Sequence, residues 1–393
     1  MTFLKRCAAL IALSSWAIAP AFSQATSTDT APAQTTPPPA AAAPPAAPTW
    51  SIGPIDFSGT VDGYVNYNVN QPQTASGSPG NNTYRNFDVK ADQFALNLAK
   101  VTLNHDPDPV GVHFDFGFGE ALDTIHSAAD PKAFQYIEQA FISLKPPKAK
   151  GLEADFGMFV TSAGAEVIES KDNWNYSRSL LFAWAIPYYH FGLRTSIPLS
   201  KTVTGGVQVV NGWNDIEDNN SGKTIGVTGV WTKPKFTLSG NYYTGPENTG
   251  TNKGFRNLID TTLLLTPPGK INAYLNYDYG QNKNYNVTGF ADGSSAHWQG
   301  VAGAVHIQAN SKIAITPRAE IFDDNRGFST GVAQTLKEFT FTGEYKMLEG
   351  VLFRAEYRGD FSDQPSFLKK ISGTEKSQHT LEFAFVGFFG PKR

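Results

Sequence analysis

Apolar and polar residues alternate along this chain in runs of roughly ten residues. In the segment 271–280 (INAYLNYDYG), Ile271 and Leu275 fall on one side of an extended strand. Asn272 and Asp278 fall on the other side, because successive side chains of a strand point to opposite faces. The pattern recurs at residues 55–69, 112–119, 152–160, 236–243, 313–322, 338–347 and 351–361. Runs of this length suit tilted membrane-spanning strands.

The gaps between the runs alternate in length. Seven short gaps carry turn residues, as in TPPGK and LEG, and eight long polar gaps separate them, which leaves sixteen strands. Short turns at one rim and long loops at the other are the plan of an outer-membrane barrel. A soluble β-sandwich or β-helix has no reason to alternate its loop lengths so strictly. We therefore expect an all-β fold, a transmembrane up-and-down antiparallel β-barrel of about 16 strands from about Ile55 to Phe389.

The first residues predict secretion. Lys5 and Arg6 precede an apolar run that is too short to span a membrane, and a small-residue cleavage site ends at Ser23. We predict a signal peptide over residues 1–23. The only cysteine, Cys7, lies within it, so the mature chain would have no disulfide and no thiol ligand.

Composition then divides the remaining chain into two parts. Residues 24–50 are rich in Pro and Ala and are expected to be a disordered periplasmic segment, whereas residues 51–393 form the expected outer-membrane barrel. The net charge of −3 argues against a nucleic-acid partner. The longest apolar stretch, LLFAWAIPYY, contains Pro187 and is too short for a membrane-spanning helix.

The segment Gly164–Arg194 resembles the signature region of the OmpL-like β-barrel porins. In that family an N-Y-S-R-S segment, here Asn175–Ser179, is followed by a proline and by an H-x-G strand, here Pro187 and then His190 and Gly192. The resemblance implies a passive porin in the outer membrane of a Gram-negative envelope. It does not identify the solute.

The expected partners are those of such a porin: outer-membrane lipid, lipopolysaccharide, small hydrophilic solutes and the barrel-assembly machinery. A homo-oligomer remains an open alternative. The last predicted strand, LEFAFVGFF, ends in the aromatic Phe389, but four residues, GPKR, follow it. Outer-membrane barrels usually end on the aromatic residue itself, so this extension departs from the pattern.

Strand parity predicts which charged side chains face the lumen. The polar face of the alternating runs carries both signs of charge, which would order water and screen solutes inside a channel. The predicted pore-lining residues are Asp62, Asp115, Glu153, Asp155, Arg194, Asp278, Arg318, Glu320, Glu344, Arg354, Glu356, Arg358 and Asp360. Alternatively, each of these side chains only pairs with an opposite charge across the wall and keeps the interior hydrated.

The third long gap, about Ser162–Leu181, is the candidate constriction loop. It carries Glu166, Glu169, Asp172 and Arg178, and the apolar stretch after it could pack the loop inward. A wide barrel needs some element to narrow its lumen. The alternative is an exposed loop at the rim.

We further expect lumen arginines to set ion preference, because arginine stays charged at any working pH. These are Arg194, Arg318, Arg354 and Arg358.

No motif predicts catalysis, a cofactor or a metal site. The acidic loop segments 214–220 and 323–325 lack the EF-hand spacing, and G-x-S-x-G, H-E-x-x-H and P-loop motifs are absent. A non-enzymatic porin for passive diffusion of small hydrophilic solutes or ions is therefore favoured. The alternatives are a lipid-active enzyme in the barrel wall, which parity disfavours by placing His190 in the lumen, and a barrel adhesin or structural anchor.

Overall fold

The computed structural model describes residues 51–127, 130–283 and 295–391. The predicted signal peptide and the Pro/Ala-rich segment lie outside the described residues. The described residues include four short helical elements: α2 (Glu120–Ile125), the 3-10 helices η1 (Phe134–Tyr136) and η2 (Ser170–Asp172), and α3 (Leu180–Trp184). None of the described helices is long and apolar enough to cross a membrane.

Strands account for most of the described chain. They are β1 (Ser51–Ile52), β2 (Ile55–Asn68), β3 (Phe94–His105), β4 (Val110–Phe118), β5 (Ile137–Leu144), β6 (Glu153–Val160), β7 (Tyr189–Pro198), β8 (Val203–Val210), β9 (Thr224–Lys233), β10 (Phe236–Pro246), β11 (Phe255–Leu265), β12 (Ile271–Asn282), β13 (Ala296–Gln308), β14 (Ile313–Asp324), β15 (Gln334–Leu348), β16 (Val351–Ser362), β17 (Phe367–Lys369), β18 (Gly373–Glu375) and β19 (Ser377–Phe389).

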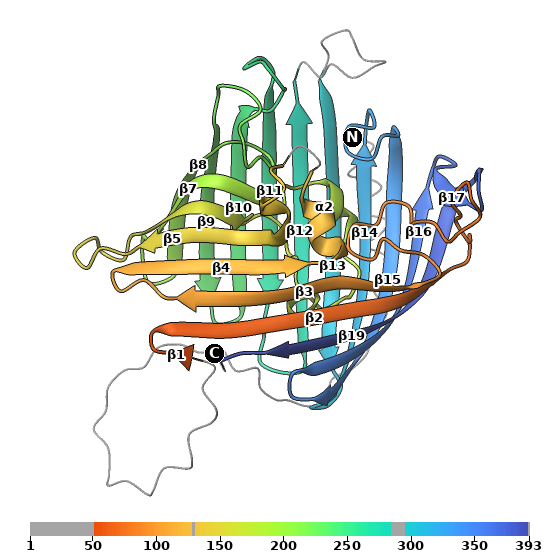
Figure 1. The fold of residues 1–393 in the computed structure, drawn as a ribbon, viewed down its shortest axis with the longest axis horizontal. Coiled ribbons are helices and arrows are strands. Elements are labelled where there is room, and N and C mark those ends of the chain that lie inside the picture. Colours follow the sequence, from red (N-terminus) through yellow and green to blue (C-terminus); the bar gives the residue numbers. More distant parts are fainter. Residues whose placement is uncertain (1–50, 128–129, 284–294, 392–393) are drawn as a thin grey trace, which may run out of the picture.

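The strands form a closed antiparallel barrel. From β2 to β16 each strand pairs with the next, β16 pairs with β19, and β19 pairs with β2 to close the wall. Figure 1 shows β19 and β2 side by side, although they come from opposite ends of the chain. Sixteen strands build the wall, so the predicted fold is confirmed. The small strands β17 and β18 form a separate hairpin within the last long loop.

The exposure of the side chains follows the predicted alternation. In β12, Ile271 and Leu275 are 52% and 46% exposed, whereas Asn276 and Asp278 are 3% and 0% exposed. Large apolar side chains thus cover the outside of the wall, where burial in lipid rather than in a protein core removes them from water. Polar side chains fill the inside.

Connection lengths also match the sequence pattern. Adjacent strands are joined alternately by short turns and by long loops, as between β15 and β16, where only Glu349 and Gly350 intervene. Gly350 has φ +78°, and a Cβ there would lie 2.4 Å from the carbonyl oxygen of Phe388, so this tight turn requires glycine. The third long loop, residues 161–188 between β6 and β7, is the longest connection across which every residue is described.

Candidate functional site

The predicted pore-lining residues lie in barrel strands, and most of them are buried. Three are partly exposed: Glu153, Arg194 and Glu344. The buried ones are Asp62, Asp115, Asp155, Asp278, Arg318, Glu320, Arg354, Glu356, Arg358 and Asp360. Inside a wide, water-filled barrel these side chains would contact solvent, so their burial means that protein atoms cover them.

The third loop provides much of this cover. Glu356 of β16 accepts hydrogen bonds from the backbone N–H groups of Tyr176 and Ser177 at 2.7 and 3.0 Å. Glu320 of β14 accepts from Leu180 N and Leu181 N at 2.7 and 3.3 Å. The wall therefore binds the backbone of the loop, and the loop lies inside the barrel.

Arginines of the same wall bind loop carbonyl groups. Arg354 donates to Ser170 O and to Asn173 O, each at 2.6 Å. Arg318 donates to Ser177 O at 2.6 Å. Carboxylates thus receive the N–H groups and guanidinium groups bind the C=O groups, which satisfies the buried backbone of the loop.

Strands β2 and β3, which continue the same side of the wall beyond β16 and β19, also bind the loop. Tyr176 donates its hydroxyl to Asp62 of β2 at 3.1 Å, and Ser170 donates its hydroxyl to the same carboxylate. Lys100 of β3 pairs with Glu169. The loop, which leaves the wall at β6 and returns at β7, therefore crosses the lumen to the continuous arc of wall that runs from β14 through β16 and β19 to β2 and β3.

The four predicted loop residues have different surroundings. Glu166 and Arg178 are buried, Glu169 is partly exposed, and the side chain of Asp172 is 53% exposed. Arg178 donates to the carbonyls of Val167, Ile168 and Tyr176, so it holds the loop in shape rather than facing the lumen.

An apolar cluster lies inside the barrel at the end that carries the long loops. Phe87 of the first long loop, Leu122 of α2 and Leu181 of α3 are at most 1% exposed and pack in one cluster with Trp298 of β13. The α3 helix begins at Ser179, whose hydroxyl accepts a hydrogen bond from Phe182 N at 3.0 Å. Three loops thus share one apolar core inside the barrel.

This cover extends around the whole wall. Each of the sixteen barrel strands contributes an inward-facing residue that is no more than 3% exposed. In chain order they are Asn66, Leu98, Asp115, Glu138, Phe159, His190, Val210, Thr224, Tyr243, Leu258, Asp278, Trp298, Phe322, Leu336, Asp360 and Gln378. Protein atoms therefore cover part of the inner face of every barrel strand.

A pocket of about 290 Å³ remains between the third loop and β10–β12. We call it the lumenal pocket. Its lining residues are Gly164, Ala165, Glu166, Asp172, Asn173, Trp174, Thr237, Ser239, Thr262, Leu264 and Tyr274. They include two carboxylates and no lysine or arginine.

The structure changes the expectation for the arginines. Arg318, Arg354 and Arg358 are 1% exposed and bind the loop and neighbouring carboxylates, so they do not contact passing ions. Only Arg194, with 27% of its side chain exposed, keeps access to the lumen, and it pairs with Asp155 at 2.7 Å.

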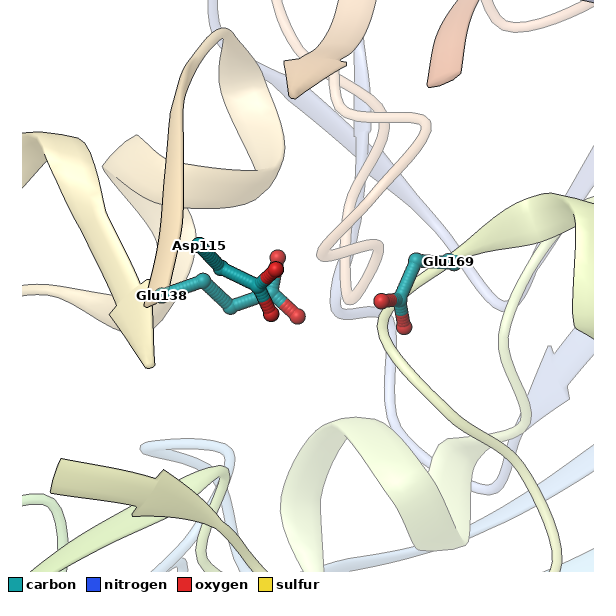
Figure 2. A group of neighbouring side chains, drawn as sticks. All are labelled: Asp115, Glu138 and Glu169. Carbon is teal, nitrogen blue, oxygen red and sulfur yellow. The ribbon is translucent and has the colours of Figure 1, made fainter. Parts of the chain in front are cut away.

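Three carboxylates from distant segments converge beside β3. Asp115, Glu138 and Glu169 point toward one another, with ligand atoms within 4.8 Å, as Figure 2 shows. Lys100 Nζ contacts all three of them, so an ammonium group already supplies the cation that such a cluster needs. Burial alone would raise the pKa of Glu169, but the Lys100 ammonium outweighs this and holds that pKa below its ordinary value.

Sequence reasoning did not select Lys100 or Glu138. Parity could have placed Lys100 inside, because it alternates with lipid-facing Val101 in β3. Glu138 shares its parity with Ile142, which is 56% exposed, and so would have been assigned to lipid. A register shift between Asp115 and Phe116 in the β4–β5 pairing breaks this parity.

Asp215 in the fourth long loop gives a test by pH. Burial and the nearby Glu247 carboxylate raise its pKa from 3.8 to about 7. Between pH 3.8 and about 7 the folded chain therefore holds a proton that the unfolded chain releases. The free energy of unfolding then falls as the pH rises through this range. We expect the Tm of the wild type to fall over this range more steeply than that of Asp215→Asn, measured by thermal unfolding. Parallel curves would contradict the assignment.

A closed barrel with an apolar outside, a polar inside and a loop folded into its lumen has the architecture of an outer-membrane porin. The chain matches the family described as "Putative beta-barrel porin-2, OmpL-like" over residues 54–389, and it belongs to that family. It is thus a passive outer-membrane channel in a bacterial envelope. No curated protein matches the chain.

Solved structures with the same fold include other outer-membrane proteins. The anion-selective porin from Comamonas acidovorans has 10% identity and a TM-score of 0.57, covering 85% of this chain and 99% of its own. The outer membrane channel DcaP of Acinetobacter baumannii has 12% identity and a TM-score of 0.55, with 85% and 97% covered. OmpT of Vibrio cholerae has 11% identity and a TM-score of 0.54, also with 85% and 97% covered. At these identities the likeness concerns the fold alone.

Proposed function

We propose that the channel passes small hydrophilic cations in preference to anions. The main support is that buried carboxyl groups outnumber buried lysines and arginines inside the barrel and its loops. The buried carboxyl residues among the described residues are Asp62, Asp88, Asp115, Asp130, Glu138, Asp155, Glu166, Glu247, Asp260, Asp278, Glu320, Asp324, Glu338, Glu356, Asp360 and Glu382. The buried lysines and arginines are Arg85, Lys100, Arg178, Arg318, Arg354 and Arg358.

This imbalance matters because the whole chain has a net charge of only −3. The basic residues are therefore placed mainly outside the buried set, in turns and loops. A low-dielectric wall concentrates the field of its charges into the lumen, so the buried carboxyl groups that are ionised and not paired with a lysine or arginine attract cations and repel anions. The lumenal pocket follows the same trend, since Glu166 and the exposed Asp172 line it without a lysine or arginine.

The test is the reversal potential of the purified protein in a planar bilayer under a KCl gradient. We expect the sign of a cation-selective pore. Asp172→Asn should reduce the selectivity, because it removes an exposed charge at the pocket. Glu375→Gln is the matched control, since Glu375 is also exposed and paired with a lysine, Lys369, but lies in the β17–β18 hairpin. A reversal potential of anion sign in the wild type would refute the proposal.

We also infer that the chain has no enzyme activity. The family and the fold are those of a channel. His190, the residue most suited to a hydrolase, is 1% exposed, stacks on Tyr243 and binds Gly212 O through Nδ1 at 3.0 Å. It therefore lies away from the lipid-facing rim. Hydrolysis of detergent esters by the purified protein would contradict this.

We also propose that the barrel contacts lipopolysaccharide and the barrel-assembly machinery, and that it assembles into a homo-oligomer. These proposals are supported by the lipid-facing aromatic residues of β19, where Phe385 and Phe389 are 56% and 46% exposed.

A further inference from the structure

Two aspartates form a buried pair in the barrel wall beside the lumenal pocket. Asp260 of β11 and Asp278 of β12 are directly opposite each other in the antiparallel register and are 1% and 0% exposed. Asn276 Nδ2 lies 3.0 Å from Oδ2 of Asp260 and 3.3 Å from Oδ1 of Asp278. One amide group therefore holds both carboxylates, which makes them close neighbours.

This pair differs from the three-carboxylate cluster of Figure 2 in having no described cation paired with it. Asn241 and Asn276 donate to Asp260, and no lysine, arginine or histidine among the described residues pairs with either aspartate. In the cluster of Figure 2, by contrast, Lys100 contacts every carboxylate. Two adjacent buried carboxylates repel each other, so both stay ionised only with a counterion.

Two further atoms indicate what that counterion is. Asp278 Oδ2 has no hydrogen-bond partner and is fully buried. Thr262 is the register partner of Asn276 on the same face, is 7% exposed, and its hydroxyl oxygen also has no partner. Buried polar atoms are nearly always satisfied, so these oxygens point to a ligand that accepts electron pairs.

We propose that Asp260 and Asp278, with the Thr262 hydroxyl, bind a divalent cation of the Ca²⁺ type. Carboxylate, hydroxyl and amide oxygens are the ligands of hard cations, and one divalent ion neutralises both carboxylates. The wall of the lumenal pocket leads to the pair, because Leu264–Tyr274, Thr262–Asn276 and Asp260–Asp278 are successive register pairs on one face.

The site also touches the third loop. Ala165 N donates to Asn276 Oδ1 at 3.2 Å, so the loop backbone binds the residue that joins the two carboxylates. A bound cation should therefore stabilise the docked loop as well as the wall. The proposal is independent of the ion preference argued above, because its test measures binding and not conductance.

The test is thermal unfolding of the purified chain in detergent, with Ca²⁺ or with EDTA at matched ionic strength. At saturating Ca²⁺ we expect the Tm of the wild type to rise by about 5 °C or more. Asp278→Asn should lose this rise. Its Tm in EDTA should equal or exceed that of the wild type, because the amide removes an uncompensated charge and keeps the shape of the side chain.

Glu375→Gln is the control, since Glu375 is an exposed acid of the β17–β18 hairpin, outside the lumenal pocket, and should leave the Ca²⁺ effect intact. A wild-type Tm that does not respond to Ca²⁺ overturns the proposal, and so does a response that persists in Asp278→Asn. A Tm in EDTA that rises on acidification, with no effect of Ca²⁺, would show a shared proton in place of the cation and would also overturn it.

Discussion

Replacing both Arg354 and Arg358 by alanine is expected to release the third loop from the wall and to raise the single-channel conductance. The two guanidinium groups bind the carbonyls of Ser170, Asn173 and Arg178. Removing one partner of a buried ion pair costs about 3–5 kcal/mol. That cost falls on the docked loop, because the barrel wall keeps its own strand pairing.

The double variant should also become more cation-selective. Without the arginines, Glu344 and Asp360 lose the partners that they bind at 2.7 and 2.9 Å. This shift would come from newly uncovered carboxylates and not from lost contacts between arginine and the ion, since the arginines are 1% exposed.

Arg194→Ala distinguishes an effect of loop release from an effect of losing an arginine that contacts the ion. Arg194 is partly exposed, pairs with Asp155, and has no bond to residues 161–188. We expect it to change ion preference modestly and to leave the conductance close to that of the wild type. Equal conductance in the wild type and the double variant would show that the remaining contacts suffice to hold the loop.

The barrel could be predicted from the sequence because its determinants are local. Alternation of residue type sets the two faces of each strand, and gap length sets the order of turns and loops. Thus Arg354, Glu356, Arg358 and Asp360, which alternate along one run, all lie inside the wall.

What covers those residues could not be predicted in the same way. Glu356 binds the backbone N–H of Tyr176, 180 positions away in the sequence. Backbone groups are present at every residue, so no side-chain pattern marks the ones that a distant carboxylate will bind. Parity assigns Arg354 and Arg358 to the inner face, but it carries no information on whether they contact solute or the loop.

The second large effect is expected from a charge placed in the apolar cluster. Leu181 of α3 is fully buried there, so Leu181→Asp loses about 1.5–3 kcal/mol of apolar burial and adds a carboxylate with no partner. The helix should leave the lumen. We expect long open events of high conductance where the wild type, with the apolar cluster in place inside the barrel, shows low conductance.

Two further variants make this result interpretable. Ser179→Ala removes the cap of α3, costs about 0.5–2 kcal/mol, and should give a smaller change in the same direction. Leu368→Asp introduces the same charge at a residue of β17 that is 43% exposed and should conduct like the wild type. Far-UV circular dichroism checks that each barrel is folded. If folded Leu181→Asp and Ser179→Ala both conduct like the wild type, the apolar cluster does not limit passage, and solute must cross by a route that leaves these loops in place.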